Sequence, residues 1–507
     1  MTNRKGKNKI LFGPVITILI LTFVIMLASL VLSRMQFEGD VTSISNGTLT
    51  TSLTLIKNIF TLDGLKFLFS SIVTNFQTFE PLALLIVALI GISIGESSGL
   101  FDIVFAPLKK INTKGMITLT LLAGIISSII GDYNYILLIP LVGVVYKITD
   151  KDSFLGIITL FIGMTIGYGT GIIYNNLDFV LGGLTQTAAT LEVDKTYVYS
   201  DLSNIYIMCV STFILMVVGS IVIEKFIVPK LPKKKIHENE ERVVSKKALY
   251  VSNMTFIVLL AIIVYMIVPG FPNSGLLLDN TSNEYISMLL GDASPFRNGL
   301  IYIFSIVLMI CGFVYGKISG NIKDTSEYSL GLSKSFNNVG FVLVLMFFTS
   351  QMISILNYTN IGPVVVAKLT DFLATLPFSG IPLIVMFFLV VIIMTIIMPS
   401  TLDKWVLMSP VVVPLFMRAN ITPDFTLFIY KIADGVGKCF SPMFIYFIIM
   451  LAFLEKYNGD SETKVTVFGT IKNLMPVYVL LGLLWLLIII CWYMIGLPSG
   501  LGTYPTL

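Results

Sequence analysis

The sequence predicts an all-α polytopic membrane protein with nine transmembrane helices and two re-entrant helical hairpins arranged as inverted repeats. Of its 507 residues, 55% are hydrophobic and only 12% are charged, and the mean hydropathy is +0.91. A soluble protein of this length cannot bury so much apolar surface, whereas a lipid bilayer accepts it. Long apolar runs alternate with loops whose lysines mark the cytoplasmic side.

The first predicted span covers residues 10–33 and follows the basic segment "MTNRKGKNK". The run is too long for a signal peptide, so residues 1–79 are expected to form an N-terminal span and an external segment. The N-terminus is then cytoplasmic and the uncharged C-terminus external. The nine runs predicted as spans are 10–33, 81–95, 153–175, 203–223, 250–269, 298–316, 335–357, 425–452 and 473–495.

Four shorter apolar runs form two pairs, 115–131/133–146 and 380–402/405–417. Lysines flank the first pair on both sides, so the chain enters and leaves the membrane on the cytoplasmic face. This predicts a re-entrant hairpin at 115–148, and counting spans predicts a second one, from the external face, at 380–420. The flanking lysines are Lys109, Lys110, Lys114, Lys147 and Lys151.

The predicted order of elements repeats itself. A span, a hairpin and two spans occur in 80–228 and again in 335–507, beginning on opposite sides of the membrane. A basic cytoplasmic linker, 229–249, and two connecting spans, 250–334, separate the halves. Each half also holds a span interrupted by glycines, in "GYGTGIIYNN" and "ADGVGKCFSP". Inverted halves with broken helices predict a secondary transporter whose substrate site lies between the breaks and the hairpin tips.

Other classes of protein are disfavoured by composition. The net charge of +4 is small, which argues against nucleic acid as a partner, and the only histidine, His237, lies in the charged linker. "GVGKC" lacks the glycine that a phosphate-binding loop needs, because position 432 is Ile. The four scattered cysteines show no metal-like spacing. We therefore expect neither enzymatic activity nor a cofactor, and a Na⁺ or H⁺ gradient as the energy source.

Three charges stand at helical spacing inside an apolar run, namely Lys431, Asp434 and Lys438. A charge at membrane depth costs about 3 kcal/mol or more unless it is paired or hydrated. We expect Asp434 to bind the coupling ion or proton, with the lysines balancing it or contacting an anionic substrate. The alternatives are a structural ion pair or a helix end at the membrane surface.

Polar residues at the other breaks are further candidates. Asp178 ends the first broken segment and is, with Asp434, a candidate for a Na⁺ site. Asp132 lies at the first hairpin tip, although either Asp178 or Asp132 could simply cap a helix. Asp403 and Lys404 mark the second tip, with mutual neutralisation as the alternative to a role in the site. Trp405 is either a membrane-interface anchor or a stacking platform for an aromatic substrate. The breaks around 357–362 add Asn357 and Asn360, which can ligate Na⁺ or cap helices.

The chain resembles the AbgT family of p-aminobenzoyl-glutamate transporters, most clearly over residues 75–450. The segments that carry the resemblance include "NFQTFEPLALLIVALIGISIGESSGL", "GDYNYILLIPL", "LDFVLGGLTQTAA", "FFTSQMISILNYTNIG" and "KWVLMSPVVVPLFM…ITPDFTLFIYKIADGVGKCFSP". The resemblance implies a homodimer of nine-span subunits with two hairpins, acting in p-aminobenzoyl-glutamate uptake or antimetabolite export. The family's functional positions fall on Asp178, Trp405, Pro423, Asp434 and Pro442.

Several polar positions depart from the family's pattern. Lys431 replaces an Arg and loses its bidentate geometry, and Lys438 replaces an Asn. Thr395 replaces an Asn, Leu402 replaces a Ser, and Asp403 stands where a small residue is usual. The fold is therefore predicted more firmly than the substrate.

The sequence thus predicts an ion-gradient-coupled carrier of a small organic anion, p-aminobenzoyl-glutamate-like or a related antimetabolite, in a bacterial plasma membrane. The tip "MPST", which contains Ser400, resembles C4-dicarboxylate carriers, so dicarboxylates or amino acids are alternative substrates. An ion channel is a less favoured alternative, because inverted hairpins are typical of alternating access.

Overall fold

The computed structural model describes residues 12–45, 48–171, 176–200, 202–231, 242–281, 284–291, 293–336, 339–458 and 465–507. Within these ranges, nine helices are long and apolar enough to cross a membrane, and a single two-stranded sheet is present. The nine are Pro14–Arg34, Leu62–Ser97, Thr113–Ile130, Ile205–Lys230, Lys246–Ile267, Pro295–Ser319, Gly340–Thr359, Gly380–Ile397 and Val467–Ile495. The predicted all-α membrane fold is confirmed.

The nine long helices are not the nine predicted spans. All but two coincide with them, and the exceptions are Thr113–Ile130 and Gly380–Ile397, the first arms of the predicted hairpins. Within the predicted span 153–175, the helix Ser153–Ile166 ends before the span does, and the predicted span 425–452 is divided between the helices Pro423–Lys438 and Ile445–Lys456. Helices of this divided kind are what the sequence predicted for a transporter core.

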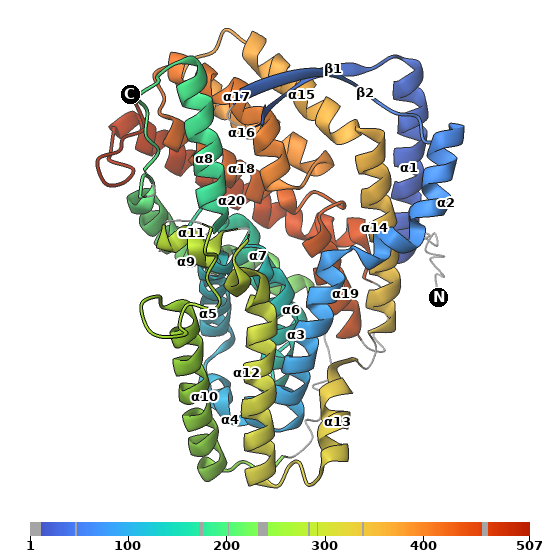
Figure 1. Ribbon diagram of the computed structural model, residues 1–507, viewed down its shortest axis with the longest axis vertical. Helices are drawn as coiled ribbons and strands as arrows, with labels where there is room; N and C mark the ends of the chain where they lie inside the picture. The colour runs from blue at the N-terminus through green and yellow to red at the C-terminus, as the bar shows by residue number, and fades with distance from the viewer. Residues whose placement is uncertain are drawn as a thin grey trace, which may run out of the picture.

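The N-terminal segment holds a feature that the sequence analysis did not foresee. After α1 (Pro14–Arg34), strands β1 (Glu38–Ser45) and β2 (Thr48–Leu55) pair antiparallel, with Glu38 opposite Leu55. The strands are rich in Thr, whose branched side chain suits extended backbone. This hairpin packs on α15 (Ile361–Thr375) and α17 (Thr401–Arg418) and lies across the top of the molecule in Figure 1.

The first half of the core consists mainly of short and medium helices. Its elements follow α2 (Leu62–Gln77) of the N-terminal segment and are α3 (Glu80–Ser97), α4 (Leu100–Val104), η1 (Ala106–Lys110), α5 (Thr113–Ile126), η2 (Ser127–Ile130), α6 (Tyr133–Ile148), α7 (Ser153–Ile166), α8 (Asn176–Glu192), α9 (Ile205–Phe226) and η3 (Val228–Lys230). Tyr146 near the end of α6 lies 2.9 Å from Thr120 in α5, oxygen to oxygen, so the chain folds back between them.

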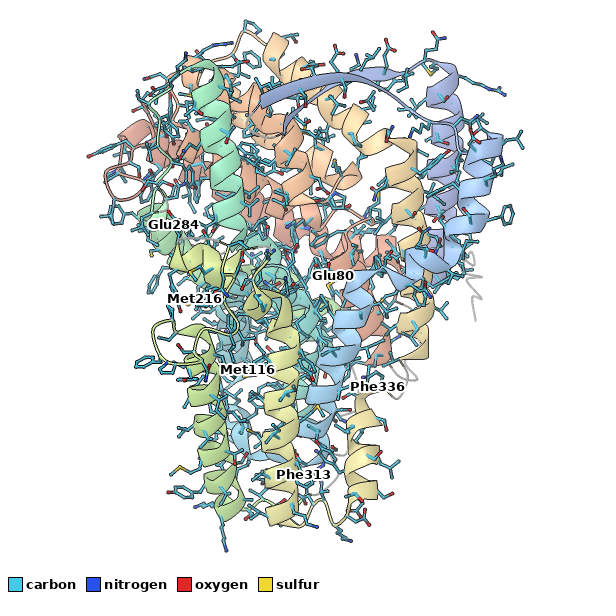
Figure 2. All side chains as sticks on the ribbon, in the orientation of Figure 1. Glu80, Met116, Met216, Glu284, Phe313 and Phe336 are labelled. Carbon is cyan, nitrogen blue, oxygen red and sulfur yellow. The ribbon has the colours of Figure 1, made fainter. Side chains whose placement is uncertain are left out.

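The connecting elements form a separate layer. They are α10 (Lys246–Ile267), α11 (Tyr285–Leu290), α12 (Pro295–Ser319), α13 (Thr325–Ser333) and η4 (Lys334–Phe336). α10 packs on α12, which packs on α3 (Figure 1). Of α10 only Ala248 and Ser252 are buried, and apolar side chains such as Phe313 cover the outer face of α12 (Figure 2). Lipid tails suit such surfaces.

The second half repeats the order of the first. Its elements are α14 (Gly340–Thr359), α15 (Ile361–Thr375), α16 (Gly380–Ile397), α17 (Thr401–Arg418), α18 (Pro423–Lys438), α19 (Ile445–Lys456) and α20 (Val467–Ile495). α7 packs against both α5 and α6, and α18 correspondingly packs against both α16 and α17. The helix that follows each break packs on the predicted hairpin of the opposite half: α8 packs on α17, and α19 packs on α6. This reciprocity supports the predicted repeat, whose orientation in the bilayer stays a prediction.

The glycines of the second broken span do not break it, contrary to the prediction. α18 continues through Gly435 and Gly437 and ends at Lys438. A Cβ at Gly435 would lie 2.3 Å from the Thr165 carbonyl oxygen, and one at Gly437 would lie 2.7 Å from the Thr395 Cβ. These glycines therefore allow α18 to approach α7 and α16. In the first half α7 ends at Ile166, and residues 172–175 of "GYGTGIIYNN" lie outside the described residues.

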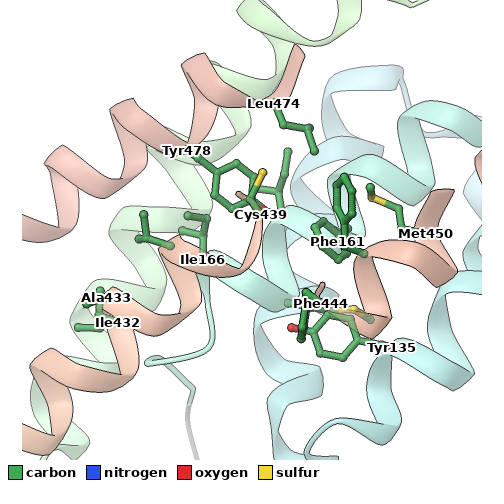
Figure 3. Packing of buried hydrophobic residues seen from close by; sticks show 14 of the residues in the cluster. Tyr135, Phe161, Ile166, Ile432, Ala433, Cys439, Phe444, Met450, Leu474 and Tyr478 are labelled. Atoms are coloured by element: carbon green, nitrogen blue, oxygen red, sulfur yellow. The ribbon is translucent and has the colours of Figure 1, made fainter. Parts of the chain in front are cut away.

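Aromatic side chains fill the space between the two halves. Tyr135, Phe161 and Phe444 meet beside α18, with the Tyr135 and Phe444 rings 5.6 Å apart (Figure 3). Cys439 and Tyr478 lie together nearby, both fully buried. This packed layer holds the end of α18 against the first hairpin.

Candidate functional site

A cavity of about 450 Å³ lies where the two hairpin tips approach each other. Five of the predicted site residues line it: Asp132, Asn357, Ser400, Asp403 and Lys438. The rest of its wall comes from Leu177, Arg297, Ile353, Leu356, Met398, Pro399, Thr401, Leu402, Met443, Phe444, Ile445 and Tyr446. The mixture of apolar walls and a few convergent polar groups is typical of a small-molecule site.

The second hairpin tip is unwound backbone between two helices. α16 ends at Ile397, and α17 begins at Thr401 after Met398, Pro399 and Ser400. The Ser400 hydroxyl caps α17 by accepting a hydrogen bond from the Asp403 backbone N–H at 3.4 Å. Unwound backbone at membrane depth is tolerated where it lines a cavity, and this tip does so.

Asp434 lies at the centre of a buried polar network. Its Oδ1 accepts a hydrogen bond from Lys404 Nζ at 2.5 Å and lies 2.9 Å from Thr395 Oγ1. Its Oδ2 lies 2.5 Å from Thr401 Oγ1 and 3.5 Å from Lys438 Nζ. Asp434 and Lys404 are both 0% exposed. The alternative that Asp403 and Lys404 neutralise each other is wrong, because Lys404 pairs with Asp434 and Asp403 is exposed at the cavity.

Lys438 connects this network to the cavity. Its ammonium is 3.5 Å from the centre of the Tyr168 ring and 5.3 Å from that of Phe444, so it gains cation–π attraction as well as the Asp434 charge. Lys438 itself is only 1% exposed, yet it forms part of the cavity wall. It therefore places a buried positive charge in the wall of the cavity.

Lys431 does not balance Asp434, contrary to one predicted role. It forms a buried ion pair with Asp178 instead. One face of α18 thus supplies a lysine to a carboxylate of the first half, while its last turn contacts a hairpin of the second half. The predicted pairing failed because spacing on one helix cannot show which neighbouring helix offers a carboxylate.

Trp405 is fully buried and does not lie at a membrane interface. Its indole N–H donates to Thr185 Oγ1 at 3.0 Å, and its ring lies 4.4 Å from that of Tyr430. The Tyr430 hydroxyl in turn donates to the Thr401 carbonyl at 2.6 Å. Trp405 therefore ties the second hairpin to α8 and α18, and it is not among the residues that line the cavity.

The remaining predicted residues have structural positions. Pro423 occupies the first turn of α18, where its missing N–H costs nothing, and Pro442 lies in the break between α18 and α19. Asn360 adopts φ 58° between α14 and α15, and its side chain donates to the Leu55 carbonyl of β2 at 3.3 Å. Asn360 thus lies away from the cavity, although Asn357 lines it.

The sequence analysis missed several groups. Arg297 reaches the cavity from a connecting span, Thr401 binds Asp434, and Tyr168 faces Lys438. Thr401 is the last residue of the predicted tip "MPST", so its position was a usable signal. Tyr168 lies within the predicted broken segment "GYGTGIIYNN", whereas Arg297 carries no local signal, because only the packing of distant helices brings it here.

No group of three or more His, Cys, Asp or Glu side chains suited to a metal ion occurs in the part of the chain that the structure describes. The two buried carboxylates proposed from sequence as Na⁺ ligands, Asp434 and Asp178, each have a lysine ammonium as partner.

Comparisons with known proteins agree with the fold. A family model described as the AbgT putative transporter family matches residues 4–507. The p-aminobenzoyl-glutamate transport protein of Escherichia coli (strain K12) is 24% identical over 459 residues, covering 89% of this chain and 87% of that protein.

Two solved structures are also similar. The YdaH transporter of Alcanivorax borkumensis is 24% identical with a TM-score of 0.49, covering 97% of this chain and 100% of that chain. MtrF of Neisseria gonorrhoeae, described with a class of antimetabolite efflux pumps, is 27% identical with a TM-score of 0.49 and 98% coverage of both chains. Because the family model spans nearly the whole chain, this protein belongs to the AbgT family and is a multi-pass membrane transporter rather than an enzyme.

Proposed function

We propose that the protein is an ion-gradient-coupled secondary transporter of a small organic anion, p-aminobenzoyl-glutamate-like or a related antimetabolite. The observation that carries this proposal is the cavity between the hairpin tips, with Lys438 in its wall and the first turn of α17 at its edge. A helix N-terminus carries partial positive charge, so both features favour a carboxylate. The aromatic side chains of Phe444 and Tyr446 offer stacking surfaces beside it.

The names of the similar proteins support this substrate class. The curated relative is a p-aminobenzoyl-glutamate transport protein, and MtrF is described with antimetabolite efflux pumps. A dicarboxylate carrier on the same architecture remains the competing hypothesis, which makes succinate the informative rival ligand.

The arrangement of helices suggests how transport proceeds. Reciprocal packing of α8 on α17 and of α19 on α6 lets one half rock against the other around the cavity. Na⁺ or H⁺ is proposed to supply the energy, and binding of the ion favours one of the two orientations. We further propose a homodimer in a bacterial plasma membrane, with the N-terminus cytoplasmic and the C-terminus external.

The test is uptake into proteoliposomes that hold the full chain, under an imposed Na⁺ or H⁺ gradient. Radiolabelled p-aminobenzoyl-glutamate should accumulate, and its rate of uptake should saturate with concentration. Unlabelled succinate should inhibit this uptake only weakly. Accumulation of succinate alone would replace the proposed substrate, and linear conduction without saturation would favour a channel.

A matched pair of variants connects the test to the cavity. Lys438→Gln should raise the KM for the anion about tenfold or more, because it removes a shielded charge worth about 1.4 kcal/mol or more to a carboxylate. Lys66→Gln removes an exposed lysine of α2 and should leave transport unchanged. Equal KM values for the two variants would contradict the proposed role of Lys438.

A further inference from the structure

The ammonium of Lys404 occupies a cage of oxygen atoms. It donates to Asp434 Oδ1 at 2.5 Å, to Thr395 Oγ1 at 2.7 Å and to the Met398 carbonyl at 3.1 Å. Lys404, Asp434 and Thr395 are each 0% exposed. Each of the three ammonium protons thus has an oxygen partner.

The cage has the composition of a site for a small monovalent cation. It combines a carboxylate, a hydroxyl and a backbone carbonyl, and hard cations such as Na⁺ prefer oxygen ligands of these kinds. The carbonyl belongs to Met398, the residue that follows the last turn of α16 at the unwound tip. In transporters with broken helices, unwound carbonyls and the C-terminal ends of half-helices coordinate the coupling Na⁺.

We propose that Lys404 is a tethered substitute for a coupling cation, so that its ammonium permanently fills this oxygen cage and the site takes up no Na⁺. Transport by this protein is then independent of Na⁺ and driven by protons. This inference rests on the proposed ion-coupled function only for its statement about transport, since occupancy of the cage is a property of the folded protein alone.

The second lysine strengthens the inference. Lys438 Nζ lies 3.5 Å from the other oxygen of Asp434, and Thr401 Oγ1 lies 2.5 Å from it. The carboxylate therefore already has two ammonium groups as neighbours. A Na⁺ added to this set would be a third positive charge on one buried carboxylate, which the low-dielectric interior penalises heavily.

The first experiment compares salts on the wild-type protein. Thermal unfolding in detergent, at constant ionic strength, should give the same midpoint in NaCl, KCl and N-methylglucamine chloride, because only a bound ion stabilises the folded state. Transport should likewise be equal in Na⁺ and K⁺ and should respond to a pH gradient. A Na⁺-specific rise in the midpoint, or transport that requires Na⁺, would overturn the proposal.

The second experiment opens the cage. In Lys404→Ala the three oxygens lose their ammonium, so Na⁺ should now raise the unfolding midpoint in a saturable way, and ²²Na⁺ should bind. The double variant Lys404→Ala/Asp434→Asn lacks the carboxylate and should show neither effect. A folded Lys404→Ala protein that binds no ²²Na⁺ and whose unfolding midpoint does not change with Na⁺ would overturn the proposal.

The two experiments separate this inference from the proposed function. If Lys404→Ala is unfolded in every salt, the wild-type comparison decides the inference by itself. Neither unfolding nor ²²Na⁺ binding requires a substrate, so a protein that meets both expectations but fails to move p-aminobenzoyl-glutamate would refute the proposed substrate and leave the tethered cation standing.

Discussion

At the scale of single residues, the buried carboxylates Asp434 and Asp178 are each paired with lysine. Asp434 contacts Lys404 and Lys438, and Asp178 contacts Lys431. An isolated charge in a membrane-embedded core has a high free-energy cost, whereas a charge that is paired and hydrogen-bonded is tolerated. The hydroxyls of Thr395 and Thr401 occupy the remaining acceptor positions of Asp434. The residue pairs are therefore both structural and close to the proposed site.

Replacing Asp434 with Asn should abolish gradient-driven uptake and lower the free energy of unfolding by about 3–5 kcal/mol, because it strands the buried ammonium of Lys404. The measurements are proteoliposome uptake and denaturation in detergent. Asp63→Asn, at an exposed carboxylate in the first turn of α2, is the matched control and should change stability by less than about 1 kcal/mol. Wild-type uptake by Asp434→Asn would contradict the proposed role of this residue in gradient-driven transport.

The pair of Lys431 and Asp178 can be tested by a double-mutant cycle. Lys431→Met and Asp178→Asn should each destabilise the fold by about 3–5 kcal/mol, since each removes the ion-pair partner of a buried charge. The double variant should lose less than the sum, by about 1–3 kcal/mol, because the two charges vanish together. Strict additivity in the unfolding data would show that the two side chains do not act as a pair.

At the scale of elements, α18 shows why small residues stand among charges. It passes so close to α7 and α16 that a methyl group at Gly435 or Gly437 would clash with atoms of these helices. The sequence analysis interpreted these glycines as helix breakers, which is their commoner meaning within a broken span. Here the helix persists because its neighbours bury all of it, and the close approach selects glycine.

Gly435→Ala should therefore destabilise the protein by about 1–3 kcal/mol and slow transport, because the new methyl group collides with the Thr165 carbonyl of α7. Gly183 in α8 is the control, since nothing lies within 4 Å of a Cβ there. Gly183→Ala should be neutral or more stable by about 0.5–1 kcal/mol, as Ala favours a helix. Equal decreases in the unfolding midpoints of Gly435→Ala and Gly183→Ala would exclude packing as the cause.

At the scale of the whole molecule, one helix of each half packs on the other half beside the cavity. α8 of the first half packs on α17, and α19 of the second half packs on α6, so the cavity lies between elements of both. We expect motion of either half to change access to the cavity, as the proposed alternating access requires.

Sidedness in the membrane is tested by labelling single cysteines after Cys209 and Cys491 are changed to Ser, since Cys311 and Cys439 are buried. Leu276→Cys, between α10 and α11, should react with an impermeant maleimide in intact cells. Ser326→Cys in α13 should react only after permeabilisation, because the lysines around it predict a cytoplasmic loop. The reverse pattern would invert the predicted topology.

The sequence by itself determined the all-α membrane fold, and it predicts two re-entrant hairpins and a repeated order of elements. Those features depend on the lengths of apolar runs and on loop charges, which are local properties of the chain. It also singled out Asp434, Asp178, Asp132 and Lys438, because a charge inside an apolar run is conspicuous in any fold. The β1–β2 hairpin escaped notice, because a short polar strand pair has a weak signal beside long apolar helices.

Only the tertiary structure decided which lysine meets which carboxylate. Lys431 reaches Asp178 and Lys404 reaches Asp434 because helices far apart in sequence cross at those points, and a lysine's long flexible stem fits several partners. The same crossings placed Lys404 Nζ among the oxygens of Asp434, Thr395 and Met398. Spacing along one helix fixes which side chains share a face, whereas the contact between faces depends on packing that is spread over the whole chain.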